Sequence, residues 1–363
     1  MKILLECFIN TESGPVFTLG FARGLINNGQ EVYAILNKEC ENILEWQKVL
    51  DCSHLYVLNN SLSLKKRPIF TIRELKRIKK FFSKTSFDYY IDTFPLAMPK
   101  SIKHAINYKY SVGIDHDAIP HSSSNTSGSI KVKDSISQLD YVLILSKIYV
   151  SLVAKKYKKP LANILYMRHG AMEYPVLSSQ ETYNDKFDIN FLYFGRIDGY
   201  KGLHVLSKAY SNLAEKHENI SLTVAGGGDF SEYKREYADL PNCEVINKYL
   251  TDDDIAYYFS KPNTVVVLPY LDATQSGVIG MAFNYRTPVI VSDTGGLKEQ
   301  LFDGEMGLFV EPGNAQDLED KMEGFILNKK LYEEQKEKMD SGYKRSTWDY
   351  VTKEFLAQLK GNK

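Results

Sequence analysis

Long apolar runs are absent from this sequence of 363 residues. No stretch approaches the roughly 20 apolar residues that a membrane-spanning helix needs. The N-terminal run at residues 1–5 meets Glu6 too early to form the apolar core of a signal peptide. We therefore expect a cytoplasmic protein, either soluble or bound peripherally to the inner face of the membrane.

Cysteine is scarce, and the net charge is zero. The four cysteines, Cys7, Cys40, Cys52 and Cys243, form neither a Cys-x-x-Cys pair nor a spacing typical of metal ligands, so we expect reduced thiols that fill the core. Lysine plus arginine equals aspartate plus glutamate at 45 each, which gives no reason to expect a nucleic-acid-binding protein. Any electrostatic function has to be local.

Two phosphate-binding motifs are also missing. No Gly-x-Gly-x-x-Gly follows the first predicted strand, and no Gly-x-x-x-x-Gly-Lys-Ser/Thr occurs. Dinucleotide-dependent dehydrogenases and P-loop enzymes depend on these motifs. Both classes therefore lose their main support.

Short apolar strands alternate with helical patterns in two series. The first series has predicted strands at residues 2–9, 31–36, 55–58, 89–92, 110–114 and 141–145, with a helix at 17–28 after the first strand. The second has predicted strands at residues 189–194, 221–225, 244–246, 264–268, 288–291 and 307–310. This rhythm predicts an α/β protein with two doubly wound Rossmann-like domains facing a cleft.

The predicted domain boundaries follow from the same pattern. We expect an N-terminal Rossmann-like domain at residues 1–172, a polar linker at 173–185 and a C-terminal Rossmann-like domain at 186–343. The last segment, 344–363, is expected to hold a helix at about 346–359 that Ser346 or Thr347 caps.

Two cations follow the predicted strand 189–194, Arg196 directly and Lys201 on the loop that enters the next helix. Ligands of an open parallel sheet bind outside the carboxyl ends of its strands. Arginine offers a planar fork to phosphate oxygens and lysine a compact charge, so the pair suits a diphosphate. Solvated loop cations explain the two residues equally well, and both interpretations stay open here.

Thr274, Gln275, Ser276, Gly277 and Val278 stand between a predicted strand and an apolar helix. Such a helix start exposes backbone N–H groups and the positive end of the helix dipole, which suits phosphate. Thr274 or Ser276 is equally compatible with an ordinary N-cap.

Glycines follow two other strands. Gly226, Gly227 and Gly228 precede Asp229 and would let a ligand approach the backbone closely, but a tight turn alone explains them as well. Gly14 has the same two interpretations, because it either admits a ligand or simply precedes the helix.

His116 lies at the carboxyl end of the predicted strand 110–114, between Asp115 and Asp117. It is a candidate for donating a hydrogen bond to a sugar hydroxyl or for assisting a proton transfer. A metal site formed with His121 is the less favoured alternative, and we expect no metal. We expect His169, at the domain junction, to be structural.

Taken in order, these residues resemble the retaining GT-B glycosyltransferases of family four, also called glycosyl transferases group 1. The resemblance covers nearly the whole chain and is strongest over residues 190–313. The segments that carry it are the loop at Gly14, His116-Asp117, Gly195-Arg196 with Lys201-Gly202, 225–228, Leu268-Pro269-Tyr270, 288–290 leading to 293–296, and Trp348-Asp349 in a closing helix that crosses back to the first domain.

The resemblance implies a role for each matching residue. Arg196 and Lys201 would hold the donor diphosphate, and His116 would approach the transferred sugar. The other implied donor-binding residues are Gly14, Gly195, Gly227, Gly228, Asp229, Asn247, Lys248 and Tyr249 near the base, and Thr274, Gln275, Ser276, Gly277 and Val278. It also implies a retaining reaction without a required metal or cofactor, with a UDP- or GDP-sugar as donor.

One departure concerns two glutamates that the family usually carries before the Pro-Val-Ile strand. This sequence has Ala273 and Met281 at those positions. It is similar to a subset of the family in which a Thr-Gln-Ser-Gly-Val loop replaces the first glutamate. The resemblance therefore leaves ribose recognition without its usual carboxylate.

The resemblance predicts transfer of a hexose-type sugar from a nucleotide-diphosphate sugar to a glycan or lipid-linked acceptor, in surface polysaccharide synthesis. Two alternatives are a GT-B-shaped protein that binds a nucleotide sugar without transferring it and a sugar-nucleotide epimerase. Catalytic carboxylates for an epimerase cannot be assigned from the sequence.

A basic stretch at residues 65–84 has Glu74 as its one acidic residue. Apolar residues at helical spacing, including Ile72, Leu75 and Ile78, predict an amphipathic basic helix within it. Docking of the segment from Arg73 to Lys84 on anionic lipid is one hypothesis. A helix packed on its domain with solvated lysines is the alternative.

Overall fold

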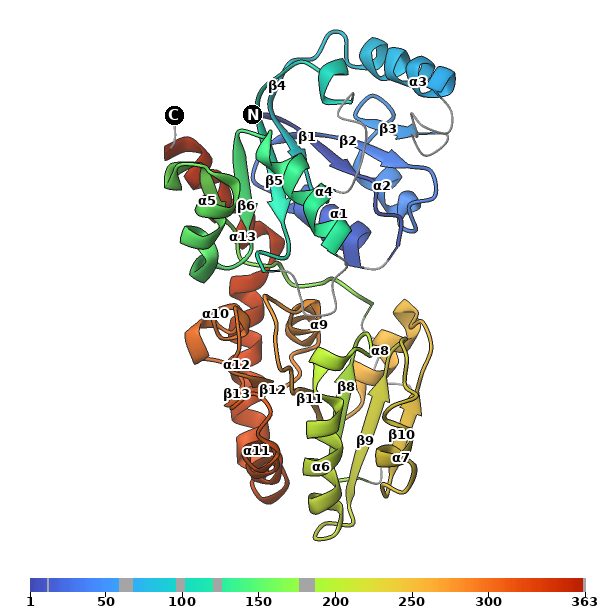
Figure 1. The fold of residues 1–363 in the computed structure, drawn as a ribbon, viewed down its shortest axis with the longest axis vertical. Helices are drawn as coiled ribbons and strands as arrows, with labels where there is room; N and C mark the ends of the chain where they lie inside the picture. The colour runs from blue at the N-terminus through green and yellow to red at the C-terminus, as the bar shows by residue number, and fades with distance from the viewer. Residues whose placement is uncertain (12, 59–67, 96–101, 120–125, 176–186, 362–363) are drawn as a thin grey trace. The chain divides into compact units, whose positions relative to one another are not determined.

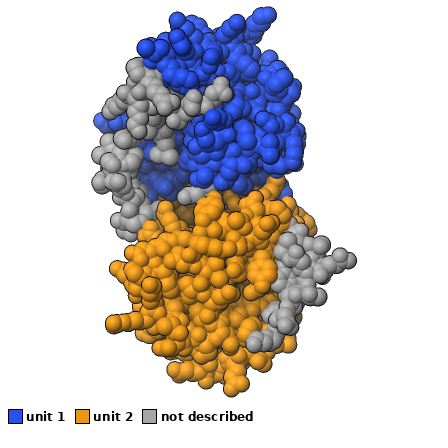
Figure 2. Space-filling view, turned by 90° about the vertical axis from the view of Figure 1, so that its right-hand side faces the viewer, with its two compact units in different colours: residues 1–120, 124–170, 347–363 blue, residues 121–123, 171–346 orange. Residues whose placement is uncertain are grey.

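The computed structural model describes residues 1–11, 13–58, 68–95, 102–119, 126–175 and 187–361. The described residues form two units, coloured separately in Figure 2. Unit 1 holds the chain up to Gly170 and again from Thr347, and unit 2 lies within Ala171–Ser346. His121 and most of the predicted linker lie outside the described residues.

Unit 1 is built on a seven-stranded sheet in which all neighbouring strands are parallel (Figure 1). The strand order is β3-β2-β1-β4-β5-β6-β7. The bounds are β1 Lys2–Cys7, β2 Glu31–Asn37, β3 Leu55–Leu58, β4 Phe87–Asp92, β5 Tyr108–Asp115, β6 Tyr141–Ile144 and β7 Ile164–Tyr166. The order reverses between β1 and β4, and ligands of doubly wound sheets bind at the carboxyl ends beside such a switch.

Unit 2 contains a six-stranded parallel sheet of order β10-β9-β8-β11-β12-β13. The bounds are β8 Ile189–Phe194, β9 Ile220–Ala225, β10 Cys243–Ile246, β11 Thr264–Leu268, β12 Val289–Ser292 and β13 Leu308–Val310. Its switch point lies between β8 and β11. The two parallel sheets confirm the predicted α/β class with two doubly wound domains.

Helices connect the strands in both units. Unit 1 has α1 Ser13–Asn27, α2 Ile43–Val49, α3 Pro68–Phe81, α4 Thr126–Ser137, α5 Val150–Tyr157 and α13 Trp348–Gly361, with short 3₁₀ turns η1 Lys103–Ala105, η2 Lys147–Tyr149 and η3 Leu161–Asn163. Unit 2 has α6 Leu203–Ala214, α7 Lys234–Ala238, α8 Asp252–Ser260, α9 Gly277–Tyr285, α10 Leu297–Gln300, α11 Ala315–Leu327 and α12 Lys329–Ser346, with η4 Gly199–Lys201 and η5 Phe302–Gly304.

The apolar strands are buried on both faces, as central strands of parallel sheets require. All residues of β8, β9 and β11 are buried. In β1, Ile3 and Leu5 join the cluster that includes α1 and α13, whereas Leu4 joins the cluster on the opposite face with residues of α3. This alternation follows from the period of two in a strand.

The C-terminal helix α13 packs directly on α1 within unit 1. A Cβ atom on Gly20 would lie 2.0 Å from the Trp348 Nε1, and one on Gly24 would lie 2.5 Å from the Trp348 carbonyl oxygen. The two glycines therefore permit the close approach of the helices. Trp348 fills the contact and meets the ring of Phe17 edge-on at 5.0 Å.

Four details differ from the sequence-based expectations or decide between them. Helix α1 begins at Ser13 rather than at residue 17, because Pro15 fits the first turn, where its missing N–H costs no hydrogen bond. The short strand β7 was not predicted. Cys52 is exposed, so the expectation of core thiols is wrong for it, whereas Cys7 and Cys40 are buried. Thr347, not Ser346, caps α13, since its Oγ1 accepts from the Tyr350 N–H at 3.4 Å.

Candidate functional site

The loops that follow β8 and β11 pack against each other at the switch point of unit 2. A Cβ atom on Gly195 would lie 3.5 Å from Val278 Cγ2, and one on Gly202 would lie 1.9 Å from the Pro269 carbonyl oxygen. The Leu271 N–H donates to the Tyr200 carbonyl at 2.8 Å. The structure thus brings the predicted cation segment and the predicted helix start together.

Lys201 presents its ammonium group to aromatic faces. Its Nζ lies 3.7 Å from the centre of the Tyr270 ring and 4.9 Å from that of Tyr200. No carboxylate forms an ion pair with it within the described part of the chain. Burial lowers the pKa of the ammonium group, and the nearby Tyr200 opposes that shift. Asp198 also opposes the shift from nearby, but a partly desolvated cation that is not engaged in a direct ion pair is well suited to an anionic ligand.

Arg196 combines a fixed backbone with an exposed head group. Its carbonyl accepts a hydrogen bond from Tyr193 Oη at 2.8 Å. The side chain is 64% exposed, and its Nε lies 3.9 Å from Asp198 Oδ2. Because exposed ion pairs of this length contribute little, the contact with Asp198 costs little to break when a ligand binds.

The start of α9 has no side-chain cap. Ser276 occupies the N-cap position, but its side chain accepts no helix amide. Its Oγ lies instead 3.3 Å from Tyr270 Oη. The interpretation of Ser276 as an ordinary N-cap is therefore wrong, and the positive end of the α9 dipole is not neutralised by that side chain.

Gln300 holds this helix start in place, and the sequence did not predict this role for Gln300. Its side-chain Oε1 accepts from the Ser276 N–H at 3.0 Å, and its Nε2 donates to the Ser276 carbonyl at 2.8 Å. Both residues are buried. The Thr274 carbonyl also accepts from the Gly296 N–H at 3.2 Å, which ties the same segment to the loop after β12.

The glycine-rich turn after β9 lies beside the cation segment. A Cβ atom on Gly226 would lie 1.8 Å from the Gly195 carbonyl oxygen. Gly228 has a φ of +149°, and its Cβ would lie 2.3 Å from the Ile197 carbonyl oxygen. Packing therefore explains these two glycines. A Cβ atom on Gly227 would lie 3.4 Å from the Lys248 carbonyl oxygen, which is an ordinary contact distance. Packing therefore does not require a glycine here, and ligand approach remains the better explanation.

The remaining predicted residues of unit 2 continue along the same sheet edge. Asp229 is exposed, and a hydrogen bond from Ser231 lowers its pKa. Lys248 pairs with Asp254 at 2.9 Å. Asn247 and Tyr249 are exposed, Tyr249 to 64%. The Tyr249 ring therefore lies largely outside the core.

Unit 1 places His116 in an aromatic setting beside its own switch point. The imidazole stacks on Phe94 with ring centres 4.1 Å apart and meets Phe17 edge-on at 4.9 Å. Its Nε2 lies 2.8 Å from the Thr93 carbonyl oxygen. Burial lowers the pKa of His116 to about 4. A carbonyl only accepts, so the neutral ring carries its proton on Nε2.

A buried carboxyl pair lies near this histidine and was not predicted. Tyr90 Oη donates to Glu6, which is 2% exposed. Burial raises the pKa of Glu6 well above its usual range and that of Asp92 to about 7. Asp115, beside His116, is also buried and accepts from Lys156 and Tyr157, both at 2.9 Å. These carboxyl groups are satisfied within unit 1.

Two predicted residues of unit 1 have packing explanations. Gly14 lies inside the first turn of α1, and its Cβ would lie 2.8 Å from Ile9 Cγ2. The expectation that it precedes the helix is therefore wrong. His169 is buried against Phe17. Its Nδ1 donates a hydrogen bond to the Gly170 carbonyl oxygen at 2.7 Å, since a carbonyl only accepts.

The metal alternative with His121 lies outside the described residues, and apolar side chains occupy the positions of the two usual glutamates. Among the described residues, no group of three His, Cys, Asp or Glu side chains could hold a metal ion. Ala273 is 1% exposed and Met281 is 8% exposed, so apolar interior residues occupy the two glutamate positions.

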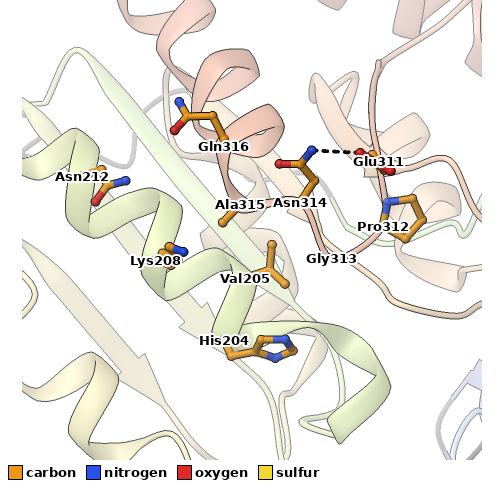
Figure 3. Close-up of a pocket in the computed structure, with 10 residues that line it drawn as sticks. All are labelled: His204, Val205, Lys208, Asn212, Glu311, Pro312, Gly313, Asn314, Ala315 and Gln316. Atoms are coloured by element: carbon orange, nitrogen blue, oxygen red, sulfur yellow. Dashed lines mark hydrogen bonds between the residues drawn. The ribbon is translucent and has the colours of Figure 1, made fainter.

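A separate pocket lies between α6 and the loop after β13, with a volume of about 560 Å³. Figure 3 shows His204, Lys208 and Asn212 on one side and the segment from Glu311 to Gln316 on the other. The Asn314 side chain donates to Glu311 at 2.9 Å within it. As far as the structure describes the chain, none of the predicted site residues lines this pocket.

Much of the second half of the chain matches a known protein family. Residues 178–341 match the family model Glycosyl transferases group 1. The uncharacterized glycosyltransferase MJ1607 of Methanocaldococcus jannaschii is 24% identical over 92% of this chain and 90% of its own. The capsular polysaccharide biosynthesis glycosyltransferase CapM of Staphylococcus aureus is 29% identical over 42% of this chain and 41% of its own.

A similar solved structure is the crystal structure of Anabaena Alr3699/HepE in complex with UDP. It has a TM-score of 0.70 and 14% sequence identity, and the match covers 99% of this chain and 100% of that chain. The likeness shows a GT-B fold for the chain.

Proposed function

We propose that this chain, a glycosyltransferase of the retaining group 1 family, transfers a hexose-type sugar from a nucleotide-diphosphate sugar to a glycan or lipid-linked acceptor. The UDP bound in the HepE structure favours a UDP-sugar over a GDP-sugar. The similarity to CapM, a glycosyltransferase of capsular polysaccharide biosynthesis, favours a role in surface polysaccharide synthesis.

One observation supports the donor site above all others. Lys201, which forms no direct ion pair with a described carboxylate, and Arg196 lie on a loop at the switch point of unit 2. This loop packs against the start of α9, which the Ser276 side chain does not cap. Cations and helix N-terminal amides are the groups that bind phosphate oxygens in proteins. We assign the donor diphosphate to them.

The same groups account for the chemistry of the departing phosphate. When the bond between the sugar and the diphosphate breaks, negative charge grows on the leaving oxygen. Arg196 and Lys201 neutralise that charge without a metal, and the α9 dipole adds to the effect. The new bond forms with retention of the configuration at the anomeric carbon.

His116 is assigned to the transferred sugar. Its Nδ1 is a hydrogen-bond acceptor, since Nε2–H is directed to the Thr93 carbonyl. A neutral ring accepts a hydrogen bond from a sugar hydroxyl, which differs from the donor role that the sequence also allowed. Gly227 and the turn of Asn247, Lys248 and Tyr249 are assigned to the nucleoside.

Product analysis with labelled donors tests the reaction. The protein is incubated with UDP-, GDP-, ADP- and CMP-sugars, and the products are separated by chromatography. Slow release of free nucleotide from one donor, without acceptor, is the expected result. Recovery of an epimerised sugar nucleotide would instead show an epimerase, and tight binding with no product would show a binding protein. Either outcome would refute the proposed transfer.

A further inference from the structure

Helix α3 presents a basic outer face at the margin of unit 1 (Figure 1). It rests on η1 and β3 and buries Thr71, Glu74 and Ile78. The side chains of Arg73, Lys76, Lys79 and Lys80 are exposed on the other side. Within the described part of the chain, no carboxylate forms an ion pair with these four cations.

Glu74, the one acidic residue of α3, does not reach this outer face. Its side chain is 0% exposed, accepts from Tyr56 Oη at 2.7 Å and pairs with Arg77 at 3.0 Å. The inward carboxylate is thus neutralised within the fold. The outer face carries positive charge alone.

Large apolar side chains project among these cations. Ile69 is 69% exposed and Ile72 is 50% exposed, although β-branched aliphatic residues are usually buried. Ile72 also borders a shallow, mainly apolar groove of about 300 Å³ that Leu75, Lys76, Lys79 and Ala105 help to line. Apolar residues ringed by lysine and arginine are typical of helices that lie in a membrane interface.

We propose that the outer face of α3 docks on an anionic lipid bilayer. The isoleucines would enter the boundary between head groups and acyl chains, while the lysines and arginines meet lipid phosphates. Charge complementarity selects this partner, because the face offers several cations and no acidic group. The inference does not depend on the proposed reaction, although a lipid-linked acceptor would be reached from such a position.

Vesicle sedimentation tests the proposal with the full-length protein. Vesicles of phosphatidylcholine alone are compared with vesicles of phosphatidylcholine and phosphatidylglycerol in equal parts, at low salt and at about 1 M salt. We expect binding to the anionic vesicles at low salt and its loss at high salt. A wild-type protein that does not sediment with anionic vesicles at low salt would overturn the proposal, and would leave a protein partner for this face.

Matched charge reversals identify the surface. Lys76→Glu with Lys80→Glu should weaken vesicle binding at least about 25-fold, since each lost cation near the surface accounts for about fivefold. Lys336→Glu with Lys338→Glu makes the same charge change on exposed residues of α12 and should bind like the wild type. Equal binding by both double variants would exclude α3.

The apolar contribution has its own test. Ile69→Ser with Ile72→Ser leaves every charge in place and should weaken binding to the anionic vesicles at low salt, relative to wild type. Thermal unfolding checks that each variant is folded. Release of nucleotide from a soluble donor, which does not need a membrane, should be the same in all variants, so failure of docking and failure of the proposed reaction are told apart.

Discussion

Replacement of Gln300 by leucine tests how the start of α9 is held in place. The side chain of Gln300 satisfies both the N–H and the carbonyl of Ser276, at 3.0 and 2.8 Å, in a buried setting. Each backbone group left unpaired costs about 1–3 kcal/mol. Because the loop relaxes partially, we expect the free energy of unfolding to fall by about 3 kcal/mol in total. This corresponds to a fall in Tm of about 6–12 °C for a unit of this size.

Urea and thermal unfolding of the Gln300→Leu variant measure this loss. Gln316→Leu is a matched control, because Gln316 makes one exposed hydrogen bond to Asp320 and its loss should change the free energy of unfolding by less than about 0.5 kcal/mol. The KM for the donor should also rise, since the amides of α9 lose their fixed position. If Gln300→Leu and wild type unfold within about 0.5 kcal/mol of each other, this explanation of the helix start is wrong.

Three further substitutions test other parts of the structure. His116 has a pKa of about 4 in the folded protein against an ordinary value of about 6.5, so on acidification the unfolded chain takes up the proton first and the fold loses stability between these pH values. The His116→Gln variant should therefore lose less stability than wild type in this interval. Histidine ¹⁵N NMR at neutral pH should show the Nε2–H tautomer. Gly228→Ala should cost about 1–3 kcal/mol because of its positive φ and close backbone contact, whereas Gly199→Ala, with open space around it, should be nearly neutral in urea unfolding. Trp348→Ala should cost about 3–5 kcal/mol in the same assay, and Tyr350→Ala, at an exposed position, should cost far less. A charged His116 ring at neutral pH, or equal costs within either pair, would contradict the respective prediction.

The sequence predicted those features of the fold that local patterns encode. Strands β8 and β11 are mainly apolar because both of their faces are buried, and the bounds predicted for them match those of the structure. Since carboxyl ends of parallel strands share one edge, the positions of Arg196 and Lys201 beside the α9 start followed from topology.

Features that depend on distant partners could not be predicted. Gln300 binds Ser276, 24 residues earlier in the chain, and nothing in its local sequence marks that contact. Glu6 and Tyr90 are 84 residues apart and meet only because β1 and β4 are neighbours in the sheet. The start of α1 was not predicted because Ser13, Gly14 and Pro15 are typical of loops. The close packing of Gly14 on Ile9, which brings the first turn of the helix there, is not visible in the local sequence.

No helix in the described residues has the length and apolar character needed to cross a membrane.

The central claim is that Arg196 and Lys201 bind the donor diphosphate, and calorimetric titration of UDP tests it most directly. A charge-assisted contact contributes about 1.5–3 kcal/mol, so Lys201→Met and Arg196→Ala should each weaken UDP binding about 10- to 150-fold. Lys208→Met removes an exposed lysine of α6 and should bind UDP like the wild type. Equal UDP affinity in wild type, Arg196→Ala and Lys201→Met would contradict the assignment of the diphosphate to these two residues.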